Sequence, residues 1–159
     1  MEFRTTNLCD AHAERLQIAD PILKDFGGRV AFCGPCTTLK VFEDDALVRT
    51  TLEEPGQGRV LVVDGGGSLR CALLDAELAE KAHQNGWHGL VVNGCIRHAA
   101  TLIKLNMGIK ALAIHPLHSV KHGVGEQDVP LRFANVQFVP GHYVYADEDG
   151  LVVSEEALI

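Results

Sequence analysis

The apolar residues in the centre of this chain fall into short runs separated by stretches with helical spacing. The runs at 60–64, 89–93 and 111–117 are apolar at consecutive positions, which is typical of parallel strands buried on both faces. The spacing predicts a helix over 69–85 between the first two runs, ended by Gly86, and a shorter helix before the third. Parallel strands joined through helices predict an α/β core.

The first third of the chain predicts a helix, an interrupted strand and a second helix. Thr6 is the predicted cap of the opening helix, and a β-rich segment at 29–44 is expected to break at Gly34-Pro35. Asp44 or Asp45 is expected to begin a short helix whose apolar positions follow helical spacing.

The C-terminal part has a different pattern. Residues 128–156 alternate apolar and polar positions, which predicts antiparallel strands. Turns are expected at Ala134-Asn135, Pro140-Gly141 and Asp149-Gly150. With no internal repeat or linker, we expect one domain over residues 1–159.

Composition narrows the class of protein and of partner. The 159 residues are 47% hydrophobic and 22% charged, with a formal net charge of −7. Such a chain is globular, and its acidity argues against direct nucleic-acid or membrane binding, which needs basic patches. The start lacks the apolar stretch of a signal peptide, and the five cysteines are an odd set, so we expect a cytoplasmic protein with reduced thiols.

Arg97 is the sharpest candidate for chemistry. It follows a buried strand after Asn93-Gly94-Cys95-Ile96, and ligands of open α/β sheets bind at the carboxyl ends of such strands. A guanidinium matches a carboxylate or phosphate with two parallel donors, so Arg97 is a candidate anion receptor. The alternative is a structural salt bridge.

Three other motifs each have a structural interpretation beside a chemical one. Gly65-Gly66-Gly67-Ser68 could hold an anion with its amides or could simply pack a strand tightly on a helix. Cys33-Gly34-Pro35-Cys36 has a dithiol spacing but is followed by a β-branched alternation, not by the helix that redox chemistry needs. His115, His118 and His122 do not have metal-site spacing, so solvated or core histidines are expected.

Motifs spread over nearly the whole chain carry a family resemblance. They are Phe26–Arg29, Thr38–Asp44, Val62–Ser68, Gly123–Glu126, Pro140-Gly141 and Tyr145–Asp147. Together they resemble the RraA-like family, which holds regulators of ribonuclease activity and class II 4-hydroxy-4-methyl-2-oxoglutarate aldolases. The resemblance implies a β/β/α swivelling-domain sandwich with a central, largely parallel sheet and a C-terminal antiparallel β layer. It also implies a ring-shaped homotrimer with pockets at subunit interfaces.

The resemblance also assigns roles to residues. In aldolase members, the backbone amides of a short loop hold the pyruvate carboxylate. That substrate-binding loop corresponds to Asp75, Ala76, Glu77 and Leu78. The arginine that binds substrate and takes part in catalysis corresponds to Arg97, and the metal-binding aspartate after it corresponds to His98. A second acidic position falls at Thr101. Magnesium prefers oxygen ligands, so His98 is expected not to bind it. In an aldolase, His98 would be a metal ligand for a softer ion such as manganese, cobalt or zinc.

These departures favour the regulator branch, which Asp75–Leu78 resembles more closely. The expected function is binding and inhibition of an RNase E-type endonuclease, whose basic RNA-binding segments an acidic partner could occupy. The alternative is a lyase that needs a divalent metal, Mg or Mn. It would be a 4-hydroxy-4-methyl-2-oxoglutarate aldolase forming pyruvate, with oxaloacetate decarboxylase side activity and a small 2-oxo acid as ligand. A small-molecule sensor that keeps the anion pocket is a third possibility.

Overall fold

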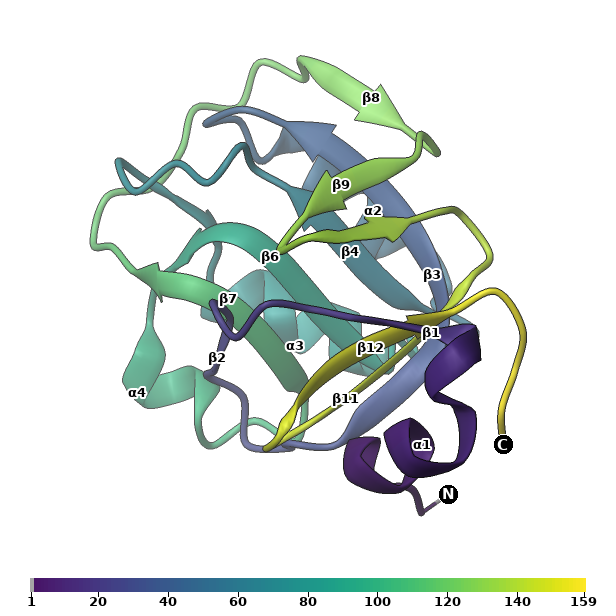
Figure 1. Cartoon of the computed structure of the whole chain (residues 1–159). Helices are drawn as coiled ribbons and strands as arrows, with labels where there is room; N and C mark the ends of the chain where they lie inside the picture. Colours follow the sequence, from purple (N-terminus) through teal and green to yellow (C-terminus); the bar gives the residue numbers. More distant parts are fainter. Residues whose placement is uncertain (1) are drawn as a thin grey trace.

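A curved mixed sheet organises the computed structural model, which describes residues 2–159 (Figure 1). The neighbouring strands are, in order, β1 (Leu16–Ile18), β12 (Gly150–Ser154), β11 (Tyr143–Asp147), β3 (Phe32–Val41), β4 (Val60–Asp64), β6 (Gly89–Ile96), β7 (Gly108–Ile114) and β2 (Lys24–Asp25). Two further strands join this sheet, β5 (Ala72–Leu74) beside β6 and β8 (Gly125–Gln127) beside β3. The mixed α/β class expected from the sequence is confirmed.

The centre of the sheet is parallel. Strands β3, β4, β6 and β7 pair in parallel, and all five residues of β4 are buried. This explains the consecutive apolar residues, because such a strand is covered on both faces. The strand predicted at 60–64 has the bounds expected, β6 continues to Ile96, and β7 covers 108–114, earlier than the predicted 111–117.

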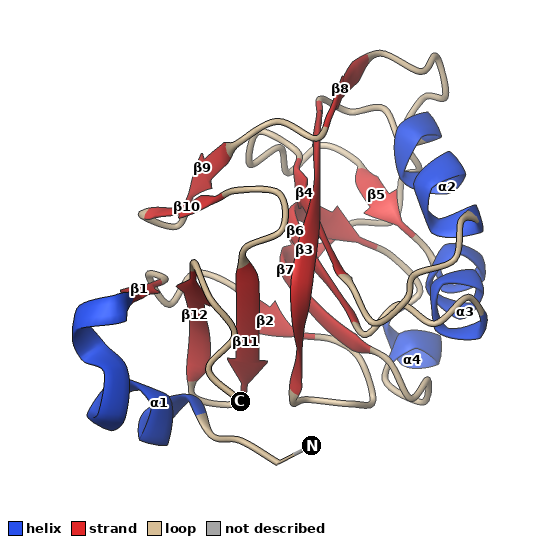
Figure 2. Ribbon diagram, turned by 90° about the vertical axis from the view of Figure 1, so that its right-hand side faces the viewer, coloured by secondary structure: helices blue, strands red, loops and turns tan. Residues whose placement is uncertain are grey.

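Helices cover one face of the sheet, on the right in Figure 2. They are α2 (Ala46–Glu53), α3 (Ala76–Gln84) and α4 (Ala99–Leu102). Val48 and Leu52 of α2 and Leu78 of α3 join Leu61 and Val63 of β4 in the core between the two layers. None of the helices within residues 2–159 is long and apolar enough to cross a membrane.

A hairpin covers the opposite face, on the left in Figure 2. It pairs β9 (Leu131–Phe133) with β10 (Val136–Phe138) through Ala134 and Asn135, both of which have positive φ. The rings of Phe133 and Phe138 stack with centroids 4.7 Å apart and pack on Val60 and Val62 of the sheet. The sandwich therefore has the β/β/α layering that was expected.

A terminal helix packs outside this sandwich. Helix α1 (Thr5–His12) and the 3₁₀ turn η1 (Ala13–Arg15) lie beside β11 and β12, and both chain ends are on this side (Figure 1). The prediction of Thr6 as the helix cap is wrong, because the helix begins at Thr5. The Thr5 amide and hydroxyl both donate to the buried carboxylate of Asp147. A cap supplied from a distant strand leaves no local pattern.

Two further predictions are corrected. The helix expected over 69–85 begins only at Ala76, because Ala72–Leu74 are buried as strand β5 beside β6. The break expected at Gly34-Pro35 is absent, and β3 runs unbroken from residue 32 to 41. Pro35 ends the pairing with β11, and the β4 pairing starts at Cys36, so the missing proline amide lies where the strand changes partners.

Candidate functional site

Neighbouring parallel strands end side by side at one edge of the sheet. Leu74 of β5 is in register with Ile96 of β6, which is in register with Ile114 of β7. The residues that follow, Asp75 and Arg97, therefore lie at the same edge. This is the carboxyl edge at which open α/β sheets bind ligands. The structure thus brings together Arg97 and the predicted loop Asp75–Leu78.

Arg97 reaches this edge without an acidic partner. Its backbone amide donates to the Leu74 carbonyl at 2.9 Å, and its Nη1 lies 3.4 Å from the Pro116 carbonyl oxygen. Its Nε is buried and has no hydrogen-bond partner, and no carboxylate within residues 2–159 forms an ion pair with it. The salt-bridge alternative is therefore not supported. A buried donor without a partner is what an anion receptor presents.

The loop Asp75–Leu78 opens helix α3 and is capped by its own first residue. One oxygen of Asp75 accepts from the Leu78 amide at 2.9 Å, and the other lies 3.1 Å from Nη2 of Arg49. This is an ordinary N-cap reinforced by an ion pair. The carboxylate of Asp75 is therefore engaged inside the loop, and the Leu78 amide is occupied.

His98 lies against the same loop. Its ring Nδ1 accepts a hydrogen bond from the Ala76 amide at 3.2 Å. Its backbone is left-handed, with φ 66° and ψ 40°, and it is the N-cap residue directly before the short helix α4. Histidine is one of the few residue types, besides glycine, that is enriched in this region. The side chain is exposed to solvent.

The residues at this edge do not fit a hard divalent cation. A neutral imidazole that accepts at Nδ1 carries its proton on Nε2 and has no second lone pair for a metal. The Asp75 carboxylate is engaged by Arg49 and Leu78, and Thr101 offers only an exposed hydroxyl. No group of three or more His, Cys, Asp or Glu side chains within residues 2–159 is arranged to hold a metal.

The glycine turn after β4 is closed by its own hydrogen bonds. The Gly65 and Gly67 amides donate to the Asn93 carbonyl, the Gly66 amide to the Asp64 carboxylate, and the Ser68 amide to the Gly65 carbonyl. Gly66 and Gly67 have positive φ, which the tight turn requires. The turn packs strand against strand, and its amides are not available to an anion.

Asp44, a possible helix start and part of a family motif in the sequence, holds a loop at this edge. Its buried carboxylate accepts from the amides of Ala46, His122 and Val124 at 3.0–3.1 Å. Burial by itself raises the pKa of this carboxyl, but the donated amides outweigh it and the pKa is lowered. The loop after β7 is thereby tied to the end of β3. Partners about 80 residues apart give no local signal.

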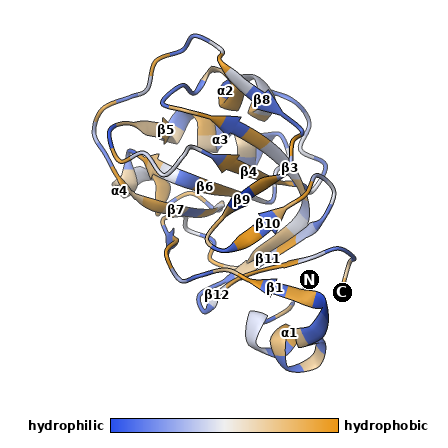
Figure 3. Cartoon of the chain, turned by 45° about the horizontal axis from the view of Figure 1, so that its top comes forward, coloured by the Kyte–Doolittle hydropathy of each residue, from blue (hydrophilic) through white to orange (hydrophobic). Residues whose placement is uncertain are grey.

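Replacing Asp44 by asparagine is expected to loosen this loop. The amide group keeps one acceptor but loses the charge and turns a donor toward backbone N–H groups, which favours opening. Hydrogen exchange of the His122 and Val124 amides should become roughly tenfold faster, the change that ~1.4 kcal/mol of lost local stability produces. Glu126→Gln, on exposed β8 (Figure 3), is the matched control and should leave these rates unchanged. Unchanged exchange in Asp44→Asn would refute the role of the carboxylate.

The other sequence candidates stay structural. The ring nitrogens of His115 and His118 contact backbone groups of their own loop, consistent with the solvated interpretation. The pair Cys33 and Cys36 lies in strand β3, not at a helix N-terminus. Burial raises the pKa of the Cys36 thiol to about 11, the opposite of what a reactive thiolate requires. Within residues 2–159 no cysteine forms a disulfide.

Exposed apolar side chains rim the carboxyl edge. The segments that carry them are adjacent, because Asp44 bridges to Val120 and Ala72 bridges to His118. The rim consists of Phe42, Leu69, Leu117, Val120 and Val124, each more than half exposed. A cluster of exposed apolar residues of this kind marks an interaction surface.

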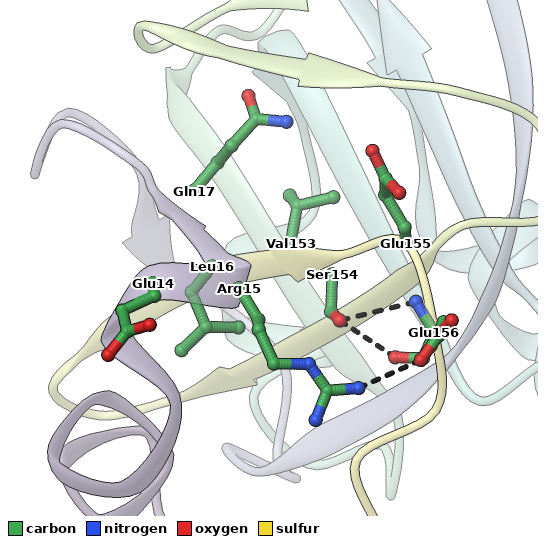
Figure 4. Close-up of a pocket in the computed structure, with 8 residues that line it drawn as sticks. All are labelled: Glu14, Arg15, Leu16, Gln17, Val153, Ser154, Glu155 and Glu156. Atoms are coloured by element: carbon green, nitrogen blue, oxygen red, sulfur yellow. Dashed lines mark hydrogen bonds and ion pairs between the residues drawn. The ribbon is translucent and has the colours of Figure 1, made fainter.

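The site is an open edge, and the hollow beside it, lined by residues that include Ala76, Thr101 and Leu102, measures about 200 Å³. A hollow of about 370 Å³ lies elsewhere, beside β1 and β12 (Figure 4). Its polar lining includes Glu14, Gln17, Glu155 and the exposed ion pair of Arg15 with Glu156, at 2.8 Å. It shares no residue with the edge that carries Arg97.

Known proteins match this chain over nearly its full length. A family model described as RraA-like, Aldolase/RraA, matches residues 5–153. A protein of Aromatoleum aromaticum, provisionally named a 4-hydroxy-4-methyl-2-oxoglutarate aldolase, is 55% identical over 159 residues and covers all of both chains.

Solved structures agree with the family match. The RNA-processing inhibitor RraA from Thermus thermophilis is 49% identical, with a TM-score of 0.95 over 100% of this chain and 96% of that one. A structure named S-adenosylmethionine:2-dimethylmenaquinone methyltransferase, from Geobacillus kaustophilus, is 44% identical. Its TM-score is 0.96 over 98% of this chain and 97% of that one.

Proposed function

Because the chain belongs to the RraA-like family, we propose that it is a regulator of ribonuclease activity that binds and inhibits an RNase E-type endonuclease. One observation carries this proposal: His98 and Asp75 are hydrogen-bonded to the loop that would hold substrate, so the edge lacks free ligands for a catalytic metal. The relative named as an RNA-processing inhibitor, 49% identical over the whole chain, supports it.

The chemistry of the surface suits a protein partner. With a net charge of −7, the chain is complementary to the basic segments with which an endonuclease binds RNA, and it has no need to contact nucleic acid itself. We propose that copies of the chain associate as a homotrimer, with Phe42, Leu69 and Val120 of the apolar rim at the interface. The expected place of action is the cytoplasm.

A second candidate is the aldolase activity after which the 55% identical relative is named. It is favoured by Arg97, whose buried Nε has no partner and suits the carboxylate of pyruvate or oxaloacetate. In such an enzyme a divalent ion supplies stabilisation of the enolate. The residues at this edge do not fit that ion, so we place the activity second.

The regulator proposal predicts inhibition in a purified system. Cleavage of a fluorescent RNA by an RNase E-type endonuclease should slow several-fold when the chain is added in molar excess. The effect should weaken from low to physiological salt, because complementary charges are screened. A chain that neither binds nor slows the enzyme at either salt concentration refutes the proposal.

The aldolase activity is tested on the same purified protein. Pyruvate release from 4-hydroxy-4-methyl-2-oxoglutarate and from oxaloacetate is measured with Mg²⁺, Mn²⁺, Co²⁺ or Zn²⁺. We expect no release above the rate of the free metal. Release that EDTA abolishes would place the aldolase first. His98→Asp restores an oxygen ligand after Arg97, so activity gained only in that variant supports the loss of the metal site in this chain.

A further inference from the structure

The ring of His98 occupies a hydrogen-bond donor that a ligand would otherwise use. The Ala76 amide is one of the first amides of α3, and such groups have no acceptor within their own helix. It donates to Nδ1 of His98 at 3.2 Å. The Leu78 amide is used in the same way by Asp75. Two amides of the loop Asp75–Leu78 are therefore satisfied by side chains of the protein itself.

Backbone hydrogen bonds on both sides fix the main chain of His98. The Arg97 amide is bonded to the Leu74 carbonyl, and the His98 carbonyl accepts from the amides of Thr101 and Leu102. Between these anchors His98 takes a left-handed conformation, which costs a non-glycine residue energy and persists only where the surroundings hold it. The main chain thus places the imidazole beside α3, and only the hydrogen bond from the Ala76 amide holds the exposed ring itself.

The residue before His98 also has a donor group that lacks an acceptor. The Nε of Arg97 is buried without a partner, in the residue directly before His98. One guanidinium nitrogen, Nη1, is 3.4 Å from the Pro116 carbonyl oxygen, whereas Nε has no acceptor in the protein and the Ala76 amide already has one. An anion could be bound by two groups here, the Arg97 guanidinium and the Ala76 amide, and the second of them is already bonded to His98.

We propose that His98 is an internal gate that takes the place of a ligand carboxylate at the Ala76 amide and keeps small carboxylates away from Arg97. The proposal concerns access to this site and is independent of the inhibition of an endonuclease. Because the ring is exposed, it can swing away, and the gate lowers affinity without abolishing it. The ligand class is a small mono- or dicarboxylate, bound without a metal.

Two substitutions at the same position separate the gate from general effects on folding. His98→Gly removes the ring and suits the left-handed backbone, so the fold is retained. His98→Asn also tolerates that backbone, and its side-chain oxygen replaces Nδ1 as the acceptor for Ala76. The first variant opens the site, and the second is the matched control that keeps it closed.

Oxalate in the presence of EDTA is the probe, measured by calorimetry and by the ¹H–¹⁵N signal of the Ala76 amide. His98→Gly should bind oxalate about tenfold more tightly than the unaltered chain, the change expected for one freed hydrogen bond. His98→Asn should bind like the unaltered chain, and Arg97→Gln added to His98→Gly should remove the gain. Equal affinity of the unaltered chain and His98→Gly, or a gain in His98→Asn, would overturn the proposal. Endonuclease inhibition assayed on the same proteins reports separately on the proposed function.

Discussion

Gly89→Ala and Gly108→Ala are each expected to destabilise the protein by about 3 kcal/mol, the upper part of the range for overpacking a core. The two glycines are in register on β6 and β7, and a Cβ at either position would overlap the ring of Phe32. Phe32 is buried and packs against sheet residues that include Val60 and Val91, so its ring has little room to move. The two glycines therefore form a flat surface, a seat without side chains, on which the Phe32 ring packs.

Urea unfolding of the two variants tests this seat. Gly150→Ala is the control, because no atom lies within 4 Å of its Cβ position and its stability should change by less than about 0.5 kcal/mol. Phe32→Leu is expected to lower the cost of Gly89→Ala in a double-mutant cycle, since the smaller side chain leaves space for the methyl group. A Gly89→Ala protein as stable as the unaltered one would show that the ring does not depend on this seat.

The sequence shows the layers of the fold but not these contacts. A strand that is buried on both faces has consecutive apolar residues. For that reason the sequence predicts both ends of the strand at 60–64 correctly. Ala72–Leu74 are equally apolar, but they lie next to a stretch with helical spacing, so the sequence predicts them as part of the helix. In the structure that helix begins only at Ala76. Phe32 precedes Gly89 by more than fifty residues, so no periodicity relates them.

The candidate site could also be predicted only in part. Arg97 could be placed at the carboxyl edge because it directly follows a buried strand, and the structure puts it there. The contact between His98 and Ala76 joins residues 22 positions apart through a left-handed backbone. Neither the conformation nor the hydrogen bond follows from residue type. From the sequence, His98 replaces a metal-binding aspartate of the family, and the structure shows that its Nδ1 lone pair accepts from the Ala76 amide.

At the carboxyl edge of the sheet, side chains of the protein itself bond to two amides of the loop Asp75–Leu78. The strands and the loop that present Arg97 are in place, and relatives named for an aldolase and for an RNA-processing inhibitor share the whole length of the chain. In this chain Asp75 and His98 bond to the loop, which favours binding over catalysis.

Asp147→Ala is expected to cost about 3–4 kcal/mol at pH 7, within the range for removing one partner from a buried charged network. The carboxylate is buried and accepts from the hydroxyl and amide of Thr5 at 2.6 and 2.7 Å and from the Asp149 amide at 3.0 Å. Its loss leaves the first turn of α1 without a cap and several donors without an acceptor. Helix α1 should detach from β11 and β12 before the rest of the chain unfolds.

The same carboxylate makes stability depend on pH. Burial by itself raises the pKa of Asp147, but the hydrogen bonds from Thr5, Asp149 and Gly150 outweigh it, so the pKa lies below its usual value of 3.8. A lowered pKa in the folded state means that the stabilisation is complete above about pH 4 and is lost as the pH falls through the folded value. Urea unfolding at pH 7, 5, 4 and 3 should therefore show a constant gap between the unaltered chain and Asp147→Ala down to about pH 4, and a narrowing gap below it. Asp149→Asn, an exposed carboxylate in the same turn, should follow the unaltered chain throughout, and a gap that does not depend on pH would show that Asp147 acts without its charge.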